Sequence, residues 1–347
     1  MSIAVYYLLI LLLLAHPHKK ELGRLAFFYL LLLFCLNTNI ADREGYEIDM
    51  YNAVYNEMIN FEPIWNGLLS LMEINKISVQ YLYMLVGIVY LPTLYFFINR
   101  LSRNNNTVLA CYMIGVFFLD VVQLRYSFSL VFVFLGLNYL LFENKKKGSV
   151  IFIGSIIVAS MIHLSNLIFL LFYFAKKLST KKVYFVSVAG FVVLTVSYTL
   201  AINYLGDIFN MASKMQRIND AEYTSINTFL LTTISELAAF GLMWFTQKHY
   251  HESNIIDDDL INIIYNAAIM SLMFIPIINF SQDIRRHIYV MFIIITAVLF
   301  RTIRSCSRRS LLQWAPILIA IIYFVSSVYT GNRDTVFFPL FDSNLLF

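Results

Sequence analysis

Acidic and aromatic residues alternate in the first long polar stretch of the chain. This stretch contains Asp49, Tyr51, Glu62 and Trp65. Carboxylates accept hydrogen bonds from sugar hydroxyls, and aromatic rings cover the apolar faces of sugars. Tyr51 and Tyr55 also share helical spacing, which is typical of a solvated amphipathic helix. The pattern therefore indicates either a carbohydrate-binding surface or a polar loop helix.

A second candidate lies at the edge of an apolar segment, where Asp120 precedes Arg125 by five residues. Ionisable side chains are costly inside a membrane, so they indicate function by default. A guanidinium group is planar, and its paired N–H donors match the spacing of two phosphate oxygens. It also stays protonated at physiological pH. The structural alternative is that Arg125 extends to the interface and pairs with Asp120.

His163 interrupts an otherwise apolar stretch and shares a helical face with Ser160 and Asn166. Histidine exchanges a proton near neutral pH, which suits general acid or base catalysis. A hydrogen-bonded structural histidine would leave the same pattern.

Arg285 and Arg286 form an adjacent pair in a short polar segment that also contains Asp283. A pyrophosphate ligand would explain two adjacent guanidinium groups at this position. Simple pairing with Asp283 is the alternative.

The chain lacks the common motifs of nucleotide, zinc and nucleophile chemistry. No Walker A, GxGxxG, HExxH, CxxC or GxSxG pattern occurs. The acidic run at residues 257–259 is typical of a solvated loop, and the three cysteines are scattered. We therefore expect no cofactor and no metal.

The elements that position these residues are membrane helices. The chain has 347 residues, of which 60% are hydrophobic and 13% charged. Soluble domains have roughly 45–50% apolar and about 25% charged residues. We predict an all-α polytopic membrane protein with a bundle of about twelve transmembrane or partly spanning helices. The apolar segments lie near residues 2–15, 25–41, 78–98, 107–124, 126–142, 149–163, 165–175, 183–205, 227–246, 261–280, 287–303 and 311–330.

The lysines and arginines predict the orientation. Most of the 25 basic residues fall in alternate short loops, which the positive-inside rule places in the cytoplasm. We thus expect a single transmembrane domain over residues 1–347, with external loops near 42–77, 206–226 and 281–286. Residues 149–175 are either two short spans bent near His163 or one long helix. The charge distribution favours the bend.

Several short motifs, taken in order, resemble the EpsG-like branch of the Wzy polysaccharide polymerases, over most of the chain. The matching residues are Asp49-Met50-Tyr51, Glu62-Pro63, Gln123-Leu124-Arg125, His163-Leu164-Ser165, Arg285-Arg286 and the tail Asn344-Leu345-Leu346-Phe347.

The resemblance implies transfer of a growing glycan from undecaprenyl pyrophosphate to a new lipid-linked oligosaccharide repeat unit. The reaction would take place on the outer face of the bacterial cytoplasmic (inner) membrane. A GT-C-like architecture would be compatible with it. The expected partners are the lipid-linked oligosaccharides and membrane lipid, with a chain-length regulator protein left open and no nucleic acid. In this assignment the pyrophosphate is held by Arg125, Arg285 and Arg286, catalysis involves His163, Asp120 and Glu62, and sugars contact Asp49, Tyr51 and Trp65.

Two other classes stay open. A flippase for lipid-linked oligosaccharide would also need cationic residues, but around a central cavity midway through the bilayer. The other class is another lipid-carrier enzyme, either a monophosphate-dependent glycosyltransferase or an integral acyltransferase. Such a glycosyltransferase would have an acidic pair in the first external loop, for which Asp42 with Glu44, or Asp49, are candidates.

Overall fold

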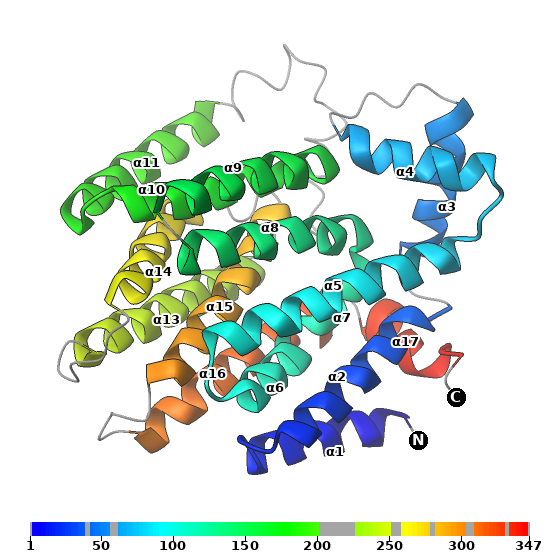
Figure 1. The fold of residues 1–347 in the computed structure, drawn as a ribbon, viewed down its shortest axis with the longest axis horizontal. Coiled ribbons are helices and arrows are strands. Elements are labelled where there is room, and N and C mark those ends of the chain that lie inside the picture. Colours follow the sequence, from blue (N-terminus) through cyan, green and yellow to red (C-terminus); the bar gives the residue numbers. More distant parts are fainter. Residues whose placement is uncertain are drawn as a thin grey trace. The chain divides into compact units, whose positions relative to one another are not determined.

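The computed structural model describes residues 2–38, 42–55, 62–143, 145–200, 226–250, 258–277, 282–302, 309–329 and 333–345. Within these ranges every regular secondary-structure element is a helix (Figure 1). The only β-type pairing there is an isolated bridge between Asn37 and Asn344. A helix satisfies its backbone hydrogen bonds internally, which a chain in lipid requires. The predicted all-α class is confirmed.

The described residues form two compact units. The first unit contains residues 1–170 and 327–347, and the second contains residues 171–326. The helices of the first unit are α1 (Ser2–Ala15), α2 (Lys20–Cys35), α3 (Arg43–Tyr55), α4 (Pro63–Ile74), α5 (Val79–Leu101), α6 (Asn105–Gly115), α7 (Phe117–Val122), α8 (Leu124–Phe142), α9 (Lys145–Ile162), the 3-10 helix η1 (Leu164–Leu170), η6 (Arg333–Phe337) and α17 (Phe338–Asp342).

The second unit is helical as well. Its elements are α10 (Leu171–Lys177), α11 (Thr180–Leu200), α13 (Ile226–Tyr250), α14 (Asp258–Ser271), the 3-10 helix η3 (Leu272–Ile277), α15 (Gln282–Thr302) and α16 (Arg309–Phe324). The π-helical turn η5 (Val325–Tyr329) contains the point at which the chain passes from the second unit to the first.

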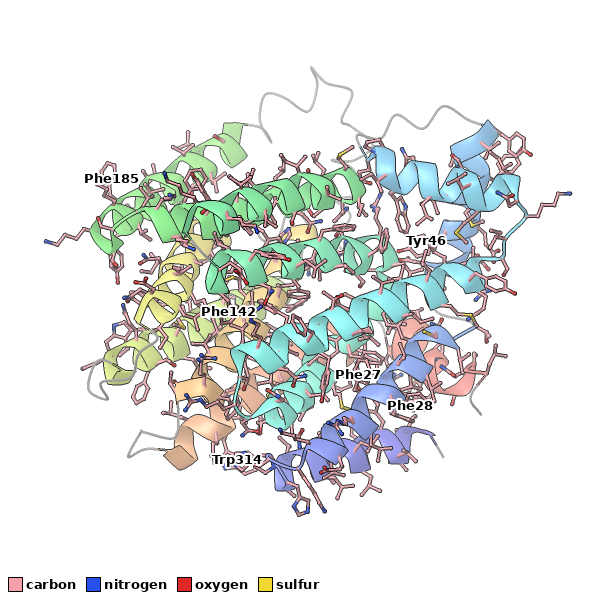
Figure 2. The ribbon with its side chains drawn as sticks, in the orientation of Figure 1. Phe27, Phe28, Tyr46, Phe142, Phe185 and Trp314 are labelled. Atoms are coloured by element: carbon pink, nitrogen blue, oxygen red, sulfur yellow. The ribbon has the colours of Figure 1, made fainter. Side chains whose placement is uncertain are left out.

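Four helical stretches among the described residues are long and apolar enough to cross a membrane. They are Val79–Leu101, Leu124–Phe142, Thr180–Ser197 and Asp259–Ile277. Large apolar side chains such as Phe28, Phe185 and Trp314 point outward and are exposed (Figure 2), as expected where lipid is the solvent. A membrane protein follows from these features, while the number of about twelve spans and the GT-C-like arrangement stay predictions.

Helices α8 and α9 form a tightly packed antiparallel hairpin in the first unit. Gly136 on α8 faces Ser155 on α9, and a Cβ added at Gly136 would lie 2.8 Å from the Ser155 Cβ. Near the turn of the hairpin, a Cβ at Gly148 would lie 2.4 Å from the Tyr139 carbonyl oxygen. The two glycines therefore allow the close approach that fixes the start of α8 beside the end of α9.

The predicted external loop near residues 42–77 contains two helices, α3 and α4, which pack against each other near the beginning of α5 (Figure 1). Pro63 occupies the first turn of α4, where a missing backbone N–H costs nothing. The Tyr46 hydroxyl donates to the Val122 carbonyl oxygen at 3.2 Å. This contact holds α3 beside the end of α7, next to where α8 begins.

The other two predicted external loops have different outcomes. Residues 206–225 lie outside the described residues, and Ile226 already begins α13. The segment 282–286 is not a loop, because α15 begins at Gln282.

The chain does not run through residues 149–175 as one long helix. Helix α9 ends at Ile162, His163 is not helical, and η1 begins at Leu164. The Asn166 side-chain amide donates to the carbonyl oxygens of Ala159 and His163, at 3.3 and 2.9 Å. Both carbonyls also accept backbone hydrogen bonds, Ala159 from the His163 N–H at 2.8 Å and His163 from the Asn166 N–H at 3.1 Å, so the Asn166 side chain reinforces the turn at the break.

Candidate functional site

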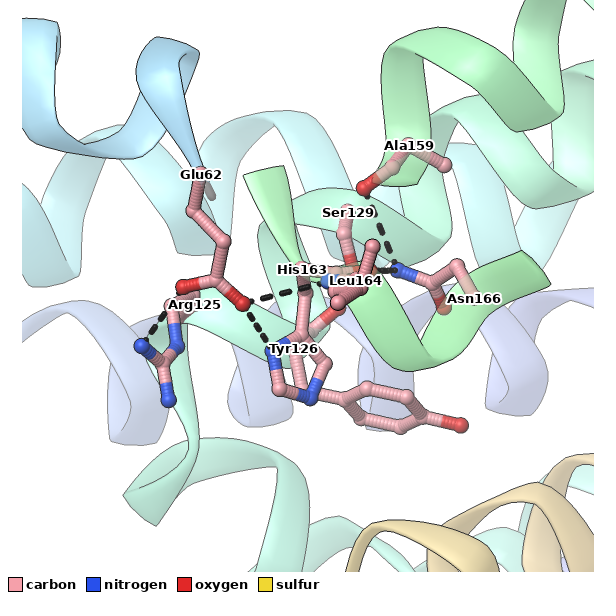
Figure 3. Close-up of polar contacts among 8 residues, drawn as sticks. All are labelled: Glu62, Arg125, Tyr126, Ser129, Ala159, His163, Leu164 and Asn166. Atoms are coloured by element: carbon pink, nitrogen blue, oxygen red, sulfur yellow. Dashed lines mark hydrogen bonds and ion pairs between the residues drawn. The ribbon is translucent and has the colours of Figure 1, made fainter. Parts of the chain in front are cut away.

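One carboxylate, that of Glu62, joins three segments that are far apart in the sequence (Figure 3). Its Oε2 accepts a hydrogen bond from Arg125 Nη1 at 2.7 Å. Its Oε1 lies 3.1 Å from His163 Nδ1 and 3.1 Å from the backbone nitrogen of Leu164. We call Glu62, Arg125 and His163 the Glu62 cluster.

The three members of the cluster are placed by the ends of helices. Glu62 directly precedes α4, Arg125 is the second residue of α8, and His163 follows the last residue of α9. Helix ends leave backbone groups without intrahelical partners. The break after α9 thus supplies both the histidine and the free Leu164 N–H that Glu62 accepts.

The cluster lies at the border of the protein interior. Glu62 and His163 are 8% and 3% exposed, whereas the Arg125 side chain is 35% exposed. Burial alone would raise the pKa of Glu62. The hydrogen bond with His163, the charge of Arg125 and the Leu164 amide together outweigh burial, so the pKa lies below its ordinary value. Glu62 is therefore a carboxylate that holds its neighbours, and it is a weak base.

His163 is oriented on several sides. A carboxylate only accepts, so the contact with Glu62 places the ring proton on Nδ1. Proton exchange with a substrate would then use Nε2. The Tyr126 ring packs edge-on against the imidazole with centroids 5.6 Å apart. Asn166, which braces the His163 carbonyl, also donates to Ser129 Oγ at 2.7 Å.

Asp49 belongs to the electrostatic surroundings of the cluster. Burial raises its pKa above the ordinary value; Arg125 opposes this shift, while Asp42 and Glu62 add to it. The predicted sugar-binding residues thus include one carboxylate within range of the Glu62 cluster.

The two predicted aromatic sugar contacts differ in exposure. Tyr51 is 54% exposed and its ring lies 4.7 Å from that of Tyr55, so its face is open to a ligand. Trp65 is buried, with its ring 6.1 Å from Tyr46 and 6.5 Å from Phe128. In this conformation Trp65 supports α4 from within and offers no open face.

Asp120, predicted as a catalytic residue, lies in a different buried network. Its Oδ2 accepts hydrogen bonds from the hydroxyls of Tyr90 and Tyr112, at 2.5 and 2.9 Å, and its carbonyl accepts from Ser127 Oγ at 2.7 Å. The hydrogen-bonding partner of Arg125 is Glu62. These contacts give Asp120 the environment of a structural group that ties α5, α6 and α8 together.

Arg285 and Arg286 lie in the first turns of α15, in the second unit, and both are partly exposed. Their predicted association with Arg125 around one pyrophosphate stays a prediction. Among the described residues no group of three or more His, Cys, Asp and Glu side chains is arranged to hold a metal ion.

The sequence did not reveal that Glu62 joins Arg125 to His163. The available signal was Glu62-Pro63, since a proline in the first turn predicts a helix that begins there. The supporting roles of Tyr126 and Asn166 were not predicted either, because they depend on tertiary contacts.

Comparison with known proteins agrees with this arrangement of motifs. The model of the EpsG family matches residues 21–340. No curated protein and no solved structure matches the chain. The family match spans both units and includes every member of the Glu62 cluster, so the resemblance seen in the motifs is confirmed and the chain belongs to the EpsG family.

Proposed function

We propose that this protein polymerises lipid-linked oligosaccharide repeat units at the outer face of the bacterial cytoplasmic membrane. Membership of the EpsG family supports a role in polysaccharide synthesis. The observation that carries the proposal is the Glu62 cluster, which combines an oriented histidine with a partly exposed arginine.

The reaction is a glycosyl transfer. An acceptor hydroxyl oxygen at the non-reducing end of one unit attacks the anomeric carbon of the growing glycan. The bond between that carbon and the pyrophosphate oxygen breaks, and undecaprenyl pyrophosphate leaves with the electron pair. The hydroxyl proton passes to His163 Nε2, while Glu62 stabilises the imidazolium that forms.

The leaving group needs positive charge that is fixed before the reaction begins. Arg125 uses Nη1 for Glu62, and a guanidinium has further N–H donors for a phosphate oxygen. Arg285 and Arg286 are the other proposed pyrophosphate ligands. Asp49 and Tyr51 would contact the sugar rings.

The position of the cluster on its helices supports an external site. Arg125 lies in the first turn of α8 and His163 follows α9, whereas Lys146 and Lys147 lie in the first turn of α9, just after the end of α8. The lysines are thus at the opposite end of the hairpin. Under the positive-inside rule the lysine end is cytoplasmic and the cluster faces outward.

Substitution in the native host tests the proposal. Arg125→Ala or Arg286→Ala should abolish long-chain polymer and leave single repeat units on the outer leaflet. Arg333→Ala is the matched control, because Arg333 is exposed and forms an exposed ion pair with its neighbour Asp334. Normal polymer ladders in both variants would refute the assignment. Repeat units that accumulate on the cytoplasmic leaflet in a deletion strain would indicate a flippase instead.

A further inference from the structure

Helix α13 carries a carboxyl group inside the second unit, at Glu236. The residue is 4% exposed, and neither carboxyl oxygen has a hydrogen-bonding partner. Within the described part of the chain, burial and the Ser271 hydroxyl are the influences on this group, and no guanidinium or ammonium is among them. An uncompensated carboxylate costs several kcal/mol in such a position, on the order of the penalty for any buried ion. Glu236 must therefore be neutralised by a proton or by a bound cation.

Hydroxyl oxygens surround Glu236 from three helices. Ser271 is the last residue of α14 and acts on the carboxyl directly. Tyr323 on α16 is fully buried, is influenced by the charge of Glu236, and its hydroxyl has no partner. Thr233 lies three residues before Glu236 on α13, which places it on the same helical face, and its hydroxyl also lacks a partner.

Each of these hydroxyl oxygens carries lone pairs as well as a proton. The Ser271 hydroxyl gives its proton to the Ala268 carbonyl oxygen at 2.8 Å, which leaves lone pairs for other contacts. A buried acid that serves only to hold helices together would be expected to have satisfied hydrogen bonds. A carboxylate with unpartnered oxygens beside hydroxyl oxygens with free lone pairs is the donor set that a hard cation requires.

The backbone beside Ser271 is irregular as well. Helix α14 ends at Ser271 and continues as the 3-10 helix η3, which contains Pro276. Proline has no N–H, so a carbonyl one turn earlier has no intrahelical donor. Interrupted membrane helices with free carbonyls are a recurrent way of binding cations.

We propose that Glu236, Ser271 and Tyr323 form an intramembrane binding site for a monovalent metal cation of the sodium class. One carboxylate balances one positive charge, whereas a divalent ion would leave a net charge in the apolar interior. Other charged or titratable side chains also lie on the helices that pack against α13. They include Tyr265 on α14, and Arg285, Arg286, His287 and Tyr289 on α15. The site is independent of the Glu62 cluster and of the proposed polymerase reaction.

A carbodiimide provides the test, because dicyclohexylcarbodiimide reacts with carboxyl groups in apolar surroundings. The full-length protein in lipid nanodiscs is labelled at fixed pH and ionic strength, in sodium chloride or N-methylglucamine chloride, and digested for mass spectrometry. We expect labelling at Glu236 in N-methylglucamine and protection by sodium. Glu143, which is exposed, is the internal control in the same digest. Labelling that is equal in both salts, or absent from Glu236, would overturn the proposal.

Variants assign the individual ligands. Ser271→Ala and Tyr323→Phe should raise the sodium concentration for half-protection by roughly tenfold or more, since even outer-shell partners of bound metals matter that much. Ser235→Ala is the matched control, because its hydroxyl donates to Leu231 on its own helix. Sodium should also raise the unfolding temperature of the wild type but not of Glu236→Gln. Equal protection in the Ser271 and Ser235 variants, or equal stabilisation of wild type and Glu236→Gln, would show that no such site exists.

Discussion

Replacing Glu62 by Gln isolates the role of one negative charge, since the two side chains have nearly the same shape. Hydrogen bonds to a charged group contribute about 1.5–3 kcal/mol when buried. Glu62 makes such contacts with His163 and Leu164 in the interior, but its partner Arg125 is 35% exposed, so solvent weakens that interaction. We expect Glu62→Gln to lower the free energy of unfolding by about 2–3 kcal/mol at neutral pH, less than the sum of the three contacts.

The effect on turnover should be larger than the effect on folding. His163 would lose the group that fixes its tautomer and stabilises its charged form, and general base catalysis is worth about 10²–10⁴-fold.

The pH dependence of stability provides a further check on Glu62. Its pKa is lowered in the folded state by His163, Arg125 and Leu164 against the effect of burial. The stabilisation is therefore fully present above the ordinary pKa of glutamate and is lost as the pH falls through the lowered value. Thermal unfolding of wild type and Glu62→Gln in nanodiscs should differ at neutral pH and converge in acid. Glu73→Gln, at the other end of α4, is the control; equal stability and turnover of the two variants would refute the role given to Glu62.

Three further predictions concern the first unit. Asp49→Asn should raise the unfolding temperature at neutral pH and leave it unchanged in strong acid, because burial raises the pKa of Asp49 and the fold therefore disfavours its charge. Asp120→Asn should lower the free energy of unfolding by about 1.5–3 kcal/mol, because two tyrosine hydroxyls lose a charged acceptor. Turnover per folded molecule should change little; thermal unfolding and a lipid-linked substrate assay measure the two quantities. Gly136→Val should prevent α8 and α9 from packing and lower the yield of folded protein, whereas Gly154→Ala, which meets nothing within 4 Å, should stabilise the same hairpin by about 0.5–1 kcal/mol.

Features set by local sequence were predictable for this chain. Apolar segments predicted helices because lipid leaves the backbone no other way to satisfy its hydrogen bonds. The break near His163 was also predictable from the charge distribution, which favours a bend although the two flanking segments are short for separate spans. Helix boundaries in the polar stretch after residue 42 were harder to predict, because α3 and α4 pack against each other and α3 is held by the hydrogen bond from Tyr46 to Val122.

The grouping of charged residues could not be predicted to the same extent. Asp120 and Arg125 are close in sequence, which favoured pairing between them, yet Glu62 lies 63 residues away and is the partner of Arg125. Sequence separation says little about contacts across a helix bundle. The buried carboxyl of Glu236 is inaccessible from the sequence for a related reason: one acidic residue in an apolar segment gains meaning only when its neighbours are known, which among the described residues are apolar surroundings and the Ser271 hydroxyl.

Whether Arg125 and Arg286 serve the same ligand can be decided with a double-mutant cycle. Lysine keeps the charge but loses the planar fork, so Arg125→Lys and Arg286→Lys should each weaken turnover with the pyrophosphate-linked donor by roughly tenfold. Two residues that bind one pyrophosphate are energetically coupled. The change in activation free energy of the double variant should therefore differ from the sum of the two single changes by about 0.5–3 kcal/mol.

For two residues that share no ligand, the changes in activation free energy should instead add to within about 0.5 kcal/mol. Arg301→Lys, in the last turn of the same helix as Arg286, supplies the control, because its effect should add to that of Arg125→Lys. An additive cycle for Arg125 with Arg286 would remove α15 from the pyrophosphate site and leave the Glu62 cluster to act with other cations. A coupled cycle would support one pyrophosphate that both arginines bind.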